Sequence, residues 1–397
     1  MGYINTTFAH GNGPYARCVE WAIEVNNVRE KKGLRRLPIV VPLVYPGRQE
    51  RIMNEEIGRN VSAGFLQQHP NEIWLDRKQG ELLGRLLFKG SDYAKNLRLL
   101  ATEYPKVESE MHRHLDGKRT VESLCGGVDR FDLRDVEFQL GINNRMQTGL
   151  PNQFYTAGAA GPFDELLEKA IADPEVGIDR ESMERVLPIA RRMIENQKII
   201  FSNVPGVFSY DESRILRDNE VLTPPFVHTP KPDDTELPGR GVYVLMTGID
   251  GIRESGMFDY VAELGMQIYT PEFSMGGLPK EVMGKAIALE PNQIMNPNIV
   301  AQYARAGWSS VWISQMAEKG FITPAYQKGD DPEMVFNHRV IKKFGLGAII
   351  KDNPRATLEE AIELAQEVGK VNDELREKYG TLDGINYSAE KVVDWLI

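Results

Sequence analysis

Short apolar runs near the amino terminus alternate with a stretch in which apolar residues recur at helical spacing. Residues 3–9 form the first run and residues 37–45 (LPIVVPLVY) the second, and both are predicted strands, although Pro42 weakens the second. Between them, apolar residues recur at helical spacing within residues 15–32, at Val19, Ala22, Ile23 and Val28. A strand, a glycine-containing loop, a helix and a strand in this order predict a parallel α/β sheet.

The middle of the chain, roughly residues 75–200, has a mainly helical pattern. Segments 78–115 and 163–197 show this pattern most strongly, and residues 198–207 (KIIFSNVPGV) follow as a late strand of the same unit. We therefore expect the first half of the chain to be an α/β domain with a helical insertion.

A linker and a second α/β unit follow. Residues 222–240 are dense in proline and charge, which is typical of a connection between domains. Residues 241–247 (GVYVLMT) then predict a new strand, residues 254–265 a helix and residues 267–270 a second strand, and this scheme continues to Gly347. The second half therefore builds a sheet of its own.

The carboxy-terminal region predicts two further helices. Thr357 and Glu360 have the spacing of a capping box at the head of a long helix that reaches about Tyr379. Ser388 is the expected cap of a last helix that ends at the final residue. These patterns divide the chain into a first domain, a second domain and a final helix, at residues 1–230, 240–375 and 376–397.

The composition narrows the classes of function. A chain of 397 residues exceeds one ordinary core, and 42% apolar with 26% charged residues fits a soluble globular protein. The net charge of −10 argues against nucleic acid as the main partner. Cys18 and Cys125 are the two cysteines, so we expect a reducing, cytoplasmic location. No secretory signal or membrane-spanning run is visible, and peripheral membrane contact stays open.

The most informative local pattern is Gly307-Trp308-Ser309-Ser310, where a predicted loop leads into a helix. A helix start offers free backbone N–H groups and a positive end, which together suit a phosphate group. Gly307 permits close approach, and Ser309 and Ser310 add hydroxyl donors. A helix start that is merely capped by serine is the competing interpretation.

Residues 300–350 resemble the donor-nucleotide half of GT-B glycosyltransferases, especially the UDP-glycosyltransferase and MurG-like members. After the loop-to-helix junction, the family has polar and glycine positions in a fixed order. This chain has them at Gly320, Pro324, Asp330, Asp331, Asn337, Gly345 and Gly347. The chain departs from the family where the usual His-Gly-Gly is Arg305-Ala306-Gly307 and where an Asp-Gln pair is Asp330-Asp331. A ribose-binding glutamate has no clear counterpart, with Gln315 and Glu318 both near.

The resemblance implies two Rossmann-like domains that face a cleft, with the last helix packed back on the first domain. Residues 1–230 would bind a small-molecule or lipid-linked acceptor, and residues 240–375 would bind a nucleoside diphosphate sugar as co-substrate. The residues expected to hold the diphosphate are Thr247, Gly248, Gly307, Trp308, Ser309 and Ser310. Those expected to contact sugar or ribose are Asp330, Asp331 and Asn337. The implied reaction transfers a sugar to a hydroxyl, with inversion and with no metal or cofactor; no Asp-x-Asp motif occurs.

A second glycine loop, Gly11-Asn12-Gly13-Pro14-Tyr15-Ala16, follows the first predicted strand. It matches the G-x-G-x-x-A dinucleotide fingerprint, but the acidic residue expected to bind a ribose hydroxyl at the end of the next strand is missing. The neighbouring Arg48 is basic and would instead suit NADP. The same loop resembles the first loop of GT-B enzymes through Gly11, Gly13 and Arg17, and that loop would contact the acceptor or the sugar. Pro14 stands at the family's histidine position, so His10 is the candidate general base, with a purely structural histidine as the alternative.

Two other functions stay open at this stage. One is a protein that binds a nucleotide or nucleotide sugar without transferring it, and the other is an NAD(P)-dependent oxidoreductase that uses the Gly11–Gly13 loop. The sequence leaves open the donor nucleotide, the sugar, the acceptor and the oligomeric state.

Overall fold

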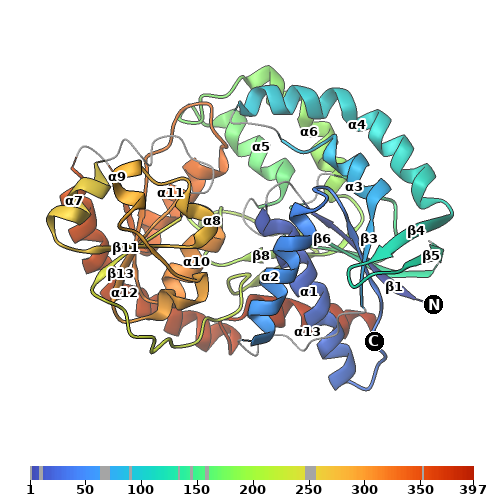
Figure 1. The fold of residues 1–397 in the computed structure, drawn as a ribbon. Helices are drawn as coiled ribbons and strands as arrows, with labels where there is room; N and C mark the ends of the chain where they lie inside the picture. The colour runs from blue at the N-terminus through green and yellow to red at the C-terminus, as the bar shows by residue number, and fades with distance from the viewer. Residues whose placement is uncertain are drawn as a thin grey trace.

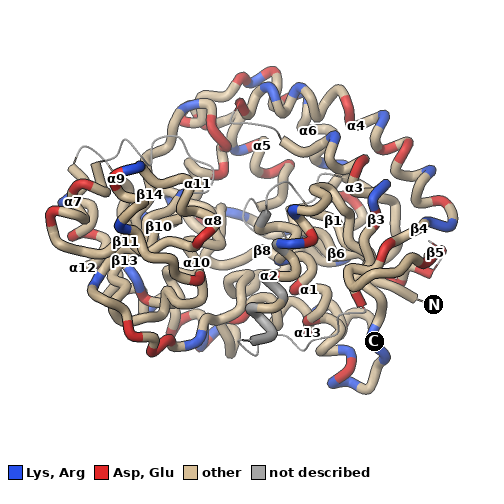
Figure 2. Tube along the Cα trace, in the orientation of Figure 1, with Lys and Arg blue, Asp and Glu red and all other residues tan. Residues whose placement is uncertain are grey.

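The computed structural model describes residues 2–8, 12–62, 72–88, 92–132, 135–143, 146–156, 161–245, 256–350 and 353–397. Two separate β-sheets, one in each half of the chain, lie side by side with helices around them (Figure 1). Basic and acidic residues are intermixed over both halves (Figure 2). Within the described residues, no helix combines the length and the apolar composition that crossing a bilayer requires.

The first sheet has nine strands in the order β5-β4-β3-β2-β1-β6-β7-β8-β9. Seven of them run parallel, and β4 and β5 form an antiparallel hairpin at one edge. Every residue of β1 is buried, as expected for a parallel strand that helices cover on both faces. The strands are β1 (Tyr3–Phe8), β2 (Ile39–Pro42), β3 (Ile73–Asp76), β4 (Lys118–Ser123), β5 (Val128–Asp132), β6 (Val136–Ile142), β7 (Gln153–Thr156), β8 (Gln197–Asn203) and β9 (Glu220–Thr223).

Helix α1 lies in the core of the first half, where Trp21 contacts the rings of Phe201 and Phe226 edge-on. The helices of this half are α1 (Asn12–Lys31), α2 (Arg48–Ser62), α3 (Arg77–Gly84), α4 (Tyr93–Leu115), α5 (Phe163–Ala172) and α6 (Arg180–Ile194).

The second sheet has six parallel strands in the order β12-β11-β10-β13-β14-β15. Numbered along the chain, this is the order 3-2-1-4-5-6 of a doubly wound nucleotide-binding fold. Its strands are β10 (Gly241–Val244), β11 (Gln267–Thr270), β12 (Ile287–Ala288), β13 (Ile299–Tyr303), β14 (Gly320–Thr323) and β15 (Ala348–Ile349). Its helices are α7 (Met257–Glu263), α8 (Glu272–Met275), α9 (Lys280–Met283), the 3₁₀ helix η4 (Pro291–Met295), α10 (Trp308–Met316), α11 (Glu333–Phe344) and α12 (Pro354–Tyr379).

The final helix, α13 (Gly384–Leu396), packs against α1 of the first half. The Trp395 ring meets Phe154 with centroids 5.3 Å apart, and Asp394 forms an ion pair with Lys32. At the head of α13, Asp383 Oδ2 lies 2.9 Å from Nδ1 of His228, a residue of the segment that joins the two sheets. The chain therefore crosses between the halves twice, once before β10 and once after α12.

The predicted α/β class with two sheets is confirmed, and so are the strand at 267–270 and the helices within 163–197. The mainly helical middle is confirmed only in part: α3 and α4 occupy most of residues 78–115, but β3 to β7 also lie between residues 73 and 156. Four of these five strands carry polar or charged side chains at several positions, as in KRTVES and VDRFD, and this hid them from a search for apolar runs.

Both predicted helix caps are also wrong. Helix α12 begins at Pro354, and its cap is Asn353, whose side chain accepts hydrogen bonds from the amides of Arg355 and Ala356. Thr357 lies inside the helix and donates to the carbonyl of Asn353 at 2.8 Å. Helix α13 is capped by Asp383, whereas Ser388 is buried within it.

Candidate functional site

In the second sheet, the strand order reverses at β10 and β13, which pair in parallel. The chain leaves these two strands toward opposite sides of the sheet, and ligands of open α/β sheets bind at the carboxyl ends of strands at such a point. Strand β13 ends at Tyr303 and continues through Ala304 to Gly307 into α10. Thr247 and Gly248, predicted to flank the phosphates after β10, lie outside the described residues.

The start of α10 leaves backbone donors unused. Its N-cap, Gly307, has no side chain to accept a hydrogen bond, and the amides of Ser310 and Val311 turn back to the Gly307 carbonyl at 3.0 and 3.1 Å. Because the first helical amides have no partner inside their own helix, and no described residue accepts from them, the N–H groups of Trp308 and Ser309 remain for an outside acceptor. An anion at this point would also interact favourably with the helix dipole.

No described residue fills the space in front of Gly307. A Cβ atom built on Gly307 would meet no heavy atom within 4 Å, and the backbone φ of −77° suits any residue. The protein's own packing and backbone geometry therefore do not require glycine at this position. What glycine provides here is room for another molecule to approach the backbone.

The side chains that follow Gly307 differ in their exposure. Trp308 is fully buried and packs on Trp312, with ring centroids 5.4 Å apart. Ser309 is exposed and Ser310 is half-buried. Trp308 can therefore contribute to the predicted phosphate site through its amide, whereas both serines can contribute amide and hydroxyl groups.

The second predicted loop, between β14 and α11, is joined to the first. Arg305 Nη2 lies 2.8 Å from both carboxylate oxygens of Asp330. Asn337 Nδ2 donates to the carbonyl of Ala306 at 2.7 Å and to Glu333 Oε1 at 3.0 Å. Asn337 is fully buried, so its amide group supports the loop that ends at Gly307. Sequence analysis singled out Asp330 and Asn337 but gave Arg305 no role.

The signal for that missed pairing was present in the sequence. Arg305 and Asp330 follow neighbouring parallel strands, and the carboxyl ends of such strands meet at one edge of the sheet. Asp330 also accepts the amide of Asp331 at 2.7 Å, and Asp331 accepts the amide of Glu333 at 3.1 Å. Both acidic residues thus shape the loop and the start of α11, and their contact with sugar or ribose stays a prediction.

His338 lies next to this loop, on α11. Burial, together with the positive charges of Lys342 and Arg305, lowers the pKa of His338 to about 4. The imidazole is therefore neutral at pH 7, and the surroundings oppose any added positive charge.

The glycine loop of the first half lies at an equivalent place, because the strand order of the first sheet also reverses between β1 and β6. His10 and Gly11 lie outside the described residues, and Asn12 is the first residue of α1. Gly13 is exposed, with open space where a Cβ would stand. Arg17 is half-buried and forms an ion pair with Glu20.

The carboxyl ends of the two sheets approach each other. Pro205 follows β8 of the first sheet, and its carbonyl accepts a 2.7 Å hydrogen bond from Trp312 Nε1 of α10. Arg339 of α11 reaches Asp173 at 2.5 Å and Glu175 at 2.7 Å, just beyond α5. The start of α10 is therefore held between the halves of the molecule. Phe273 lies on α8, the helix that follows β11, and its side chain is 64% exposed. The sequence pattern assigned Phe273 no role in a site.

Comparison with known proteins identifies the fold. No protein-family model matches the chain, and no curated protein matches it. A Polygonum tinctorium UDP-glucosyltransferase capable of glucosylating indoxyl superposes with a TM-score of 0.59 at 11% identity, covering 100% of this chain and 98% of its own. The calicheamicin glycosyltransferase CalG4 gives 0.58 at 10% identity with the same coverage.

Medicago truncatula UGT71G1, solved with UDP-glucose, gives a TM-score of 0.55 at 13% identity and again covers 100% of this chain and 98% of its own. All three structures extend over both halves of this chain. The likeness therefore concerns the whole two-sheet arrangement, which is the GT-B fold.

Proposed function

We propose that this GT-B-fold chain is a glycosyltransferase that moves a sugar from a nucleoside diphosphate sugar to an acceptor hydroxyl. The observation that carries the proposal is the open start of α10 at the strand-order reversal of the second sheet. Solved proteins of this fold include a UDP-glucosyltransferase and a protein crystallised with UDP-glucose, which favours UDP as the nucleotide.

In this proposal the diphosphate lies against the amides of Trp308 and Ser309, with the hydroxyls of Ser309 and Ser310 as further donors. These groups are fixed before the reaction and point to where negative charge develops on the leaving diphosphate, so they stabilise the transition state without a metal. The exposed ring of Phe273 offers a face on which the nucleobase can stack.

The acceptor hydroxyl is a weak acid, so its attack on the anomeric carbon needs a base. His10, which follows β1, is the proposed base, and direct displacement would invert the anomeric configuration. Arg17 and Gly13, at the start of α1, belong to the proposed acceptor side of the cleft.

A nucleotide-binding screen tests the donor site. We expect UDP to raise the melting temperature and to bind in a calorimeter with one site per chain, while NADH and NADPH do neither; TDP and GDP test the choice of base. Binding of NADH or NADPH without binding of any nucleoside diphosphate would favour the oxidoreductase and contradict the proposal.

A second experiment separates a transferase from a protein that only binds nucleotide. Hydrolysis of isotope-labelled UDP-glucose by water, in the place of an acceptor, should be measurable for the native chain. We expect it to fall at least tenfold in His10→Ala, because the base that activates the attacking hydroxyl is lost. An unchanged rate in His10→Ala removes His10 from the mechanism, and a native chain that binds UDP but never cleaves the donor contradicts transfer.

A further inference from the structure

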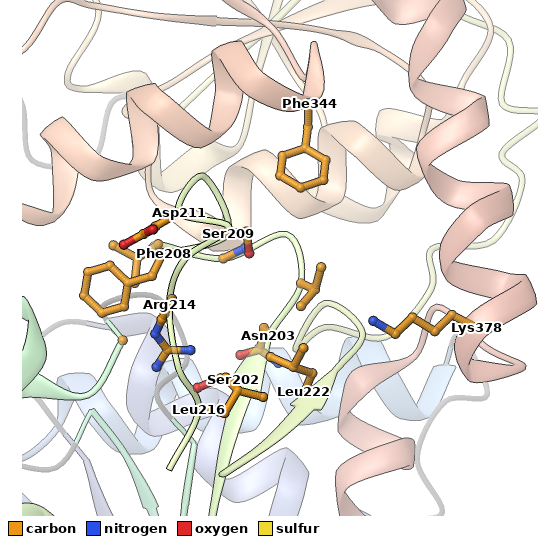
Figure 3. A pocket seen from close by; sticks show the side chains of 14 residues that line it. Ser202, Asn203, Phe208, Ser209, Asp211, Arg214, Leu216, Leu222, Phe344 and Lys378 are labelled. Atoms are coloured by element: carbon orange, nitrogen blue, oxygen red, sulfur yellow. The ribbon is translucent and has the colours of Figure 1, made fainter.

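A cavity of about 290 Å³ is lined by residues from both halves of the molecule. The first half contributes the end of β8, the following loop and β9, and the second half contributes Phe344 of α11 and Lys378 of α12 (Figure 3). None of the described residues among those predicted to hold the nucleotide sugar lines this cavity.

Two charged side chains of the lining are already neutralised. Arg214 is bonded to Glu165 at 2.6 and 2.7 Å and to Glu220 at 2.6 Å. Asp211 accepts from Lys169 at 2.7 Å, and this interaction holds its pKa at about 2. These groups therefore add little net charge to the cavity.

Two other polar groups of the lining, Asn203 and Lys378, can each accept a further interaction with a ligand. The side chain of Asn203 is only 5% exposed, and its Nδ2 donates to Thr223 Oγ1 at 2.8 Å and to the Pro224 carbonyl at 3.0 Å. Within the part of the chain that the structure describes, no group donates a hydrogen bond to its Oδ1. A buried acceptor without a donor costs free energy, so it indicates a position where a hydroxyl or N–H of another molecule belongs.

Lys378 provides the complementary charge. Its side chain extends from α12 toward Asn203 and Leu222 (Figure 3). Among the described residues no carboxylate forms an ion pair with the Lys378 ammonium, whose recorded contact is the Tyr379 ring at 5.2 Å. Among the described residues of the lining, Lys378 is therefore the cation without a carboxylate partner, and one such charge suits a monoanion.

The rest of the lining is largely apolar. Its apolar side chains are those of Val204, Val207, Phe208, Leu216, Leu222 and Phe344, and two serines, Ser202 and Ser209, also line it. From these features we infer that the cavity is a binding site for a small organic monoanion with an apolar or aromatic body and a hydroxyl group. The hydroxyl donates to Asn203 Oδ1, the carboxylate pairs with Lys378, and the body packs between Leu222 and Phe344.

Such a ligand would touch both halves of the molecule at once. The loop that carries Val204 and Gly206 also includes Pro205, which is bonded to Trp312, and Trp312 lies one helical turn beyond Trp308. A ligand in the cavity would therefore contact the loop that is bonded to α10, without contacting the described residues predicted to hold the nucleotide sugar.

The test uses 4-hydroxyphenylacetate as the probe, in a calorimetric titration of the full chain with and without saturating UDP. We expect one saturable site in both cases, weaker binding of phenylacetate, which lacks the hydroxyl, and weaker binding of 4-ethylphenol, which lacks the charge. Lys378→Gln should weaken the probe about fivefold, the scale of an exposed ion pair, and Leu222→Trp should abolish binding by filling the cavity.

Lys391→Gln is the matched control, because Lys391 is also an exposed helical lysine next to a tyrosine ring but lines no part of the cavity. It should bind the probe as the native chain does. Absence of saturable binding, equal affinities of the Lys378 and Lys391 variants, or competition by UDP would each overturn the inference. None of these outcomes depends on whether the chain transfers sugar.

Discussion

At the scale of single residues, a substitution of Gly307 can distinguish an effect on the stability of the fold from an effect on ligand binding. A Cβ there meets open space, whereas a Cβ on Gly320 would lie 2.7 Å from the Ala361 carbonyl oxygen. We expect Gly307→Ala to leave the free energy of unfolding unchanged and to weaken UDP binding about tenfold, because the methyl group holds the phosphates away from the amides.

Gly320→Ala is the contrasting variant, since it should destabilise the fold by roughly 1–3 kcal/mol through overpacking. Urea unfolding and calorimetric titration with UDP measure both properties on the same preparations. If the Gly307 variant binds UDP as tightly as the native chain, the phosphates do not lie at the start of α10.

His338 gives a prediction about pH. Its pKa is lowered from 6.5 to about 4, so between these values the unfolded chain binds a proton that the folded chain does not. The stabilisation from neutral His338 is present above pH 6.5 and is lost as the pH falls toward 4. We expect His338→Gln to remove about 2 kcal/mol of this pH dependence.

The exposed His112, on α4, serves as the control for this measurement. Free energies of unfolding measured by urea at pH 7 and pH 5 should show a smaller difference in His338→Gln than in His112→Gln. Equal differences in the two variants would mean that the buried imidazole is not the titrating group.

At the scale of elements, the cap of α12 is the clearest correction to sequence reasoning. Asn353 accepts two amides at the helix start, so Asn353→Ala should lower the free energy of unfolding by about 1 kcal/mol. Glu360→Ala should have almost no effect, because Glu360 is exposed and belongs to the capping box that the structure does not contain. A larger loss in the Glu360 variant, measured by urea unfolding, would restore the original assignment.

Long or strongly apolar elements were predictable, and short polar ones were not. The strand GVYV at β10 and the loop-to-helix junction at Gly307 follow from local pattern alone. The hairpin β4–β5 has an exposed, charged face, so it lacks the apolar run that a buried strand shows. Asn353 was overlooked because Thr357 and Glu360 offered a recognised motif one turn later.

The candidate site was predictable only in part, for a related reason. The residues of the Gly307 loop are contiguous, and their chemistry can be inferred from the helix start that they form. The link from Asn337 to the Ala306 carbonyl, and the cavity shared by Asn203 and Lys378, join residues far apart in the chain. Pairings of this kind depend on how the sheets and helices pack and leave no periodic pattern in the sequence.

At the scale of the whole molecule, the two sheets meet through a small set of directed contacts. Trp312 reaches Pro205, Arg339 reaches Asp173 and Glu175, and α13 returns to α1. Helix α10, whose start forms the proposed phosphate site, is therefore held by contacts with the first half. Donor binding and the relative arrangement of the two halves should then influence each other.

The central claim is that a diphosphate binds at the amides of Trp308 and Ser309, and a crystal structure of the full chain with UDP tests it most directly. We expect phosphate oxygens within about 3 Å of these two amides, with Gly307 facing the nucleotide. A nucleotide seated instead on the Gly11–Gly13 turn, with the start of α10 left empty, would contradict the claim.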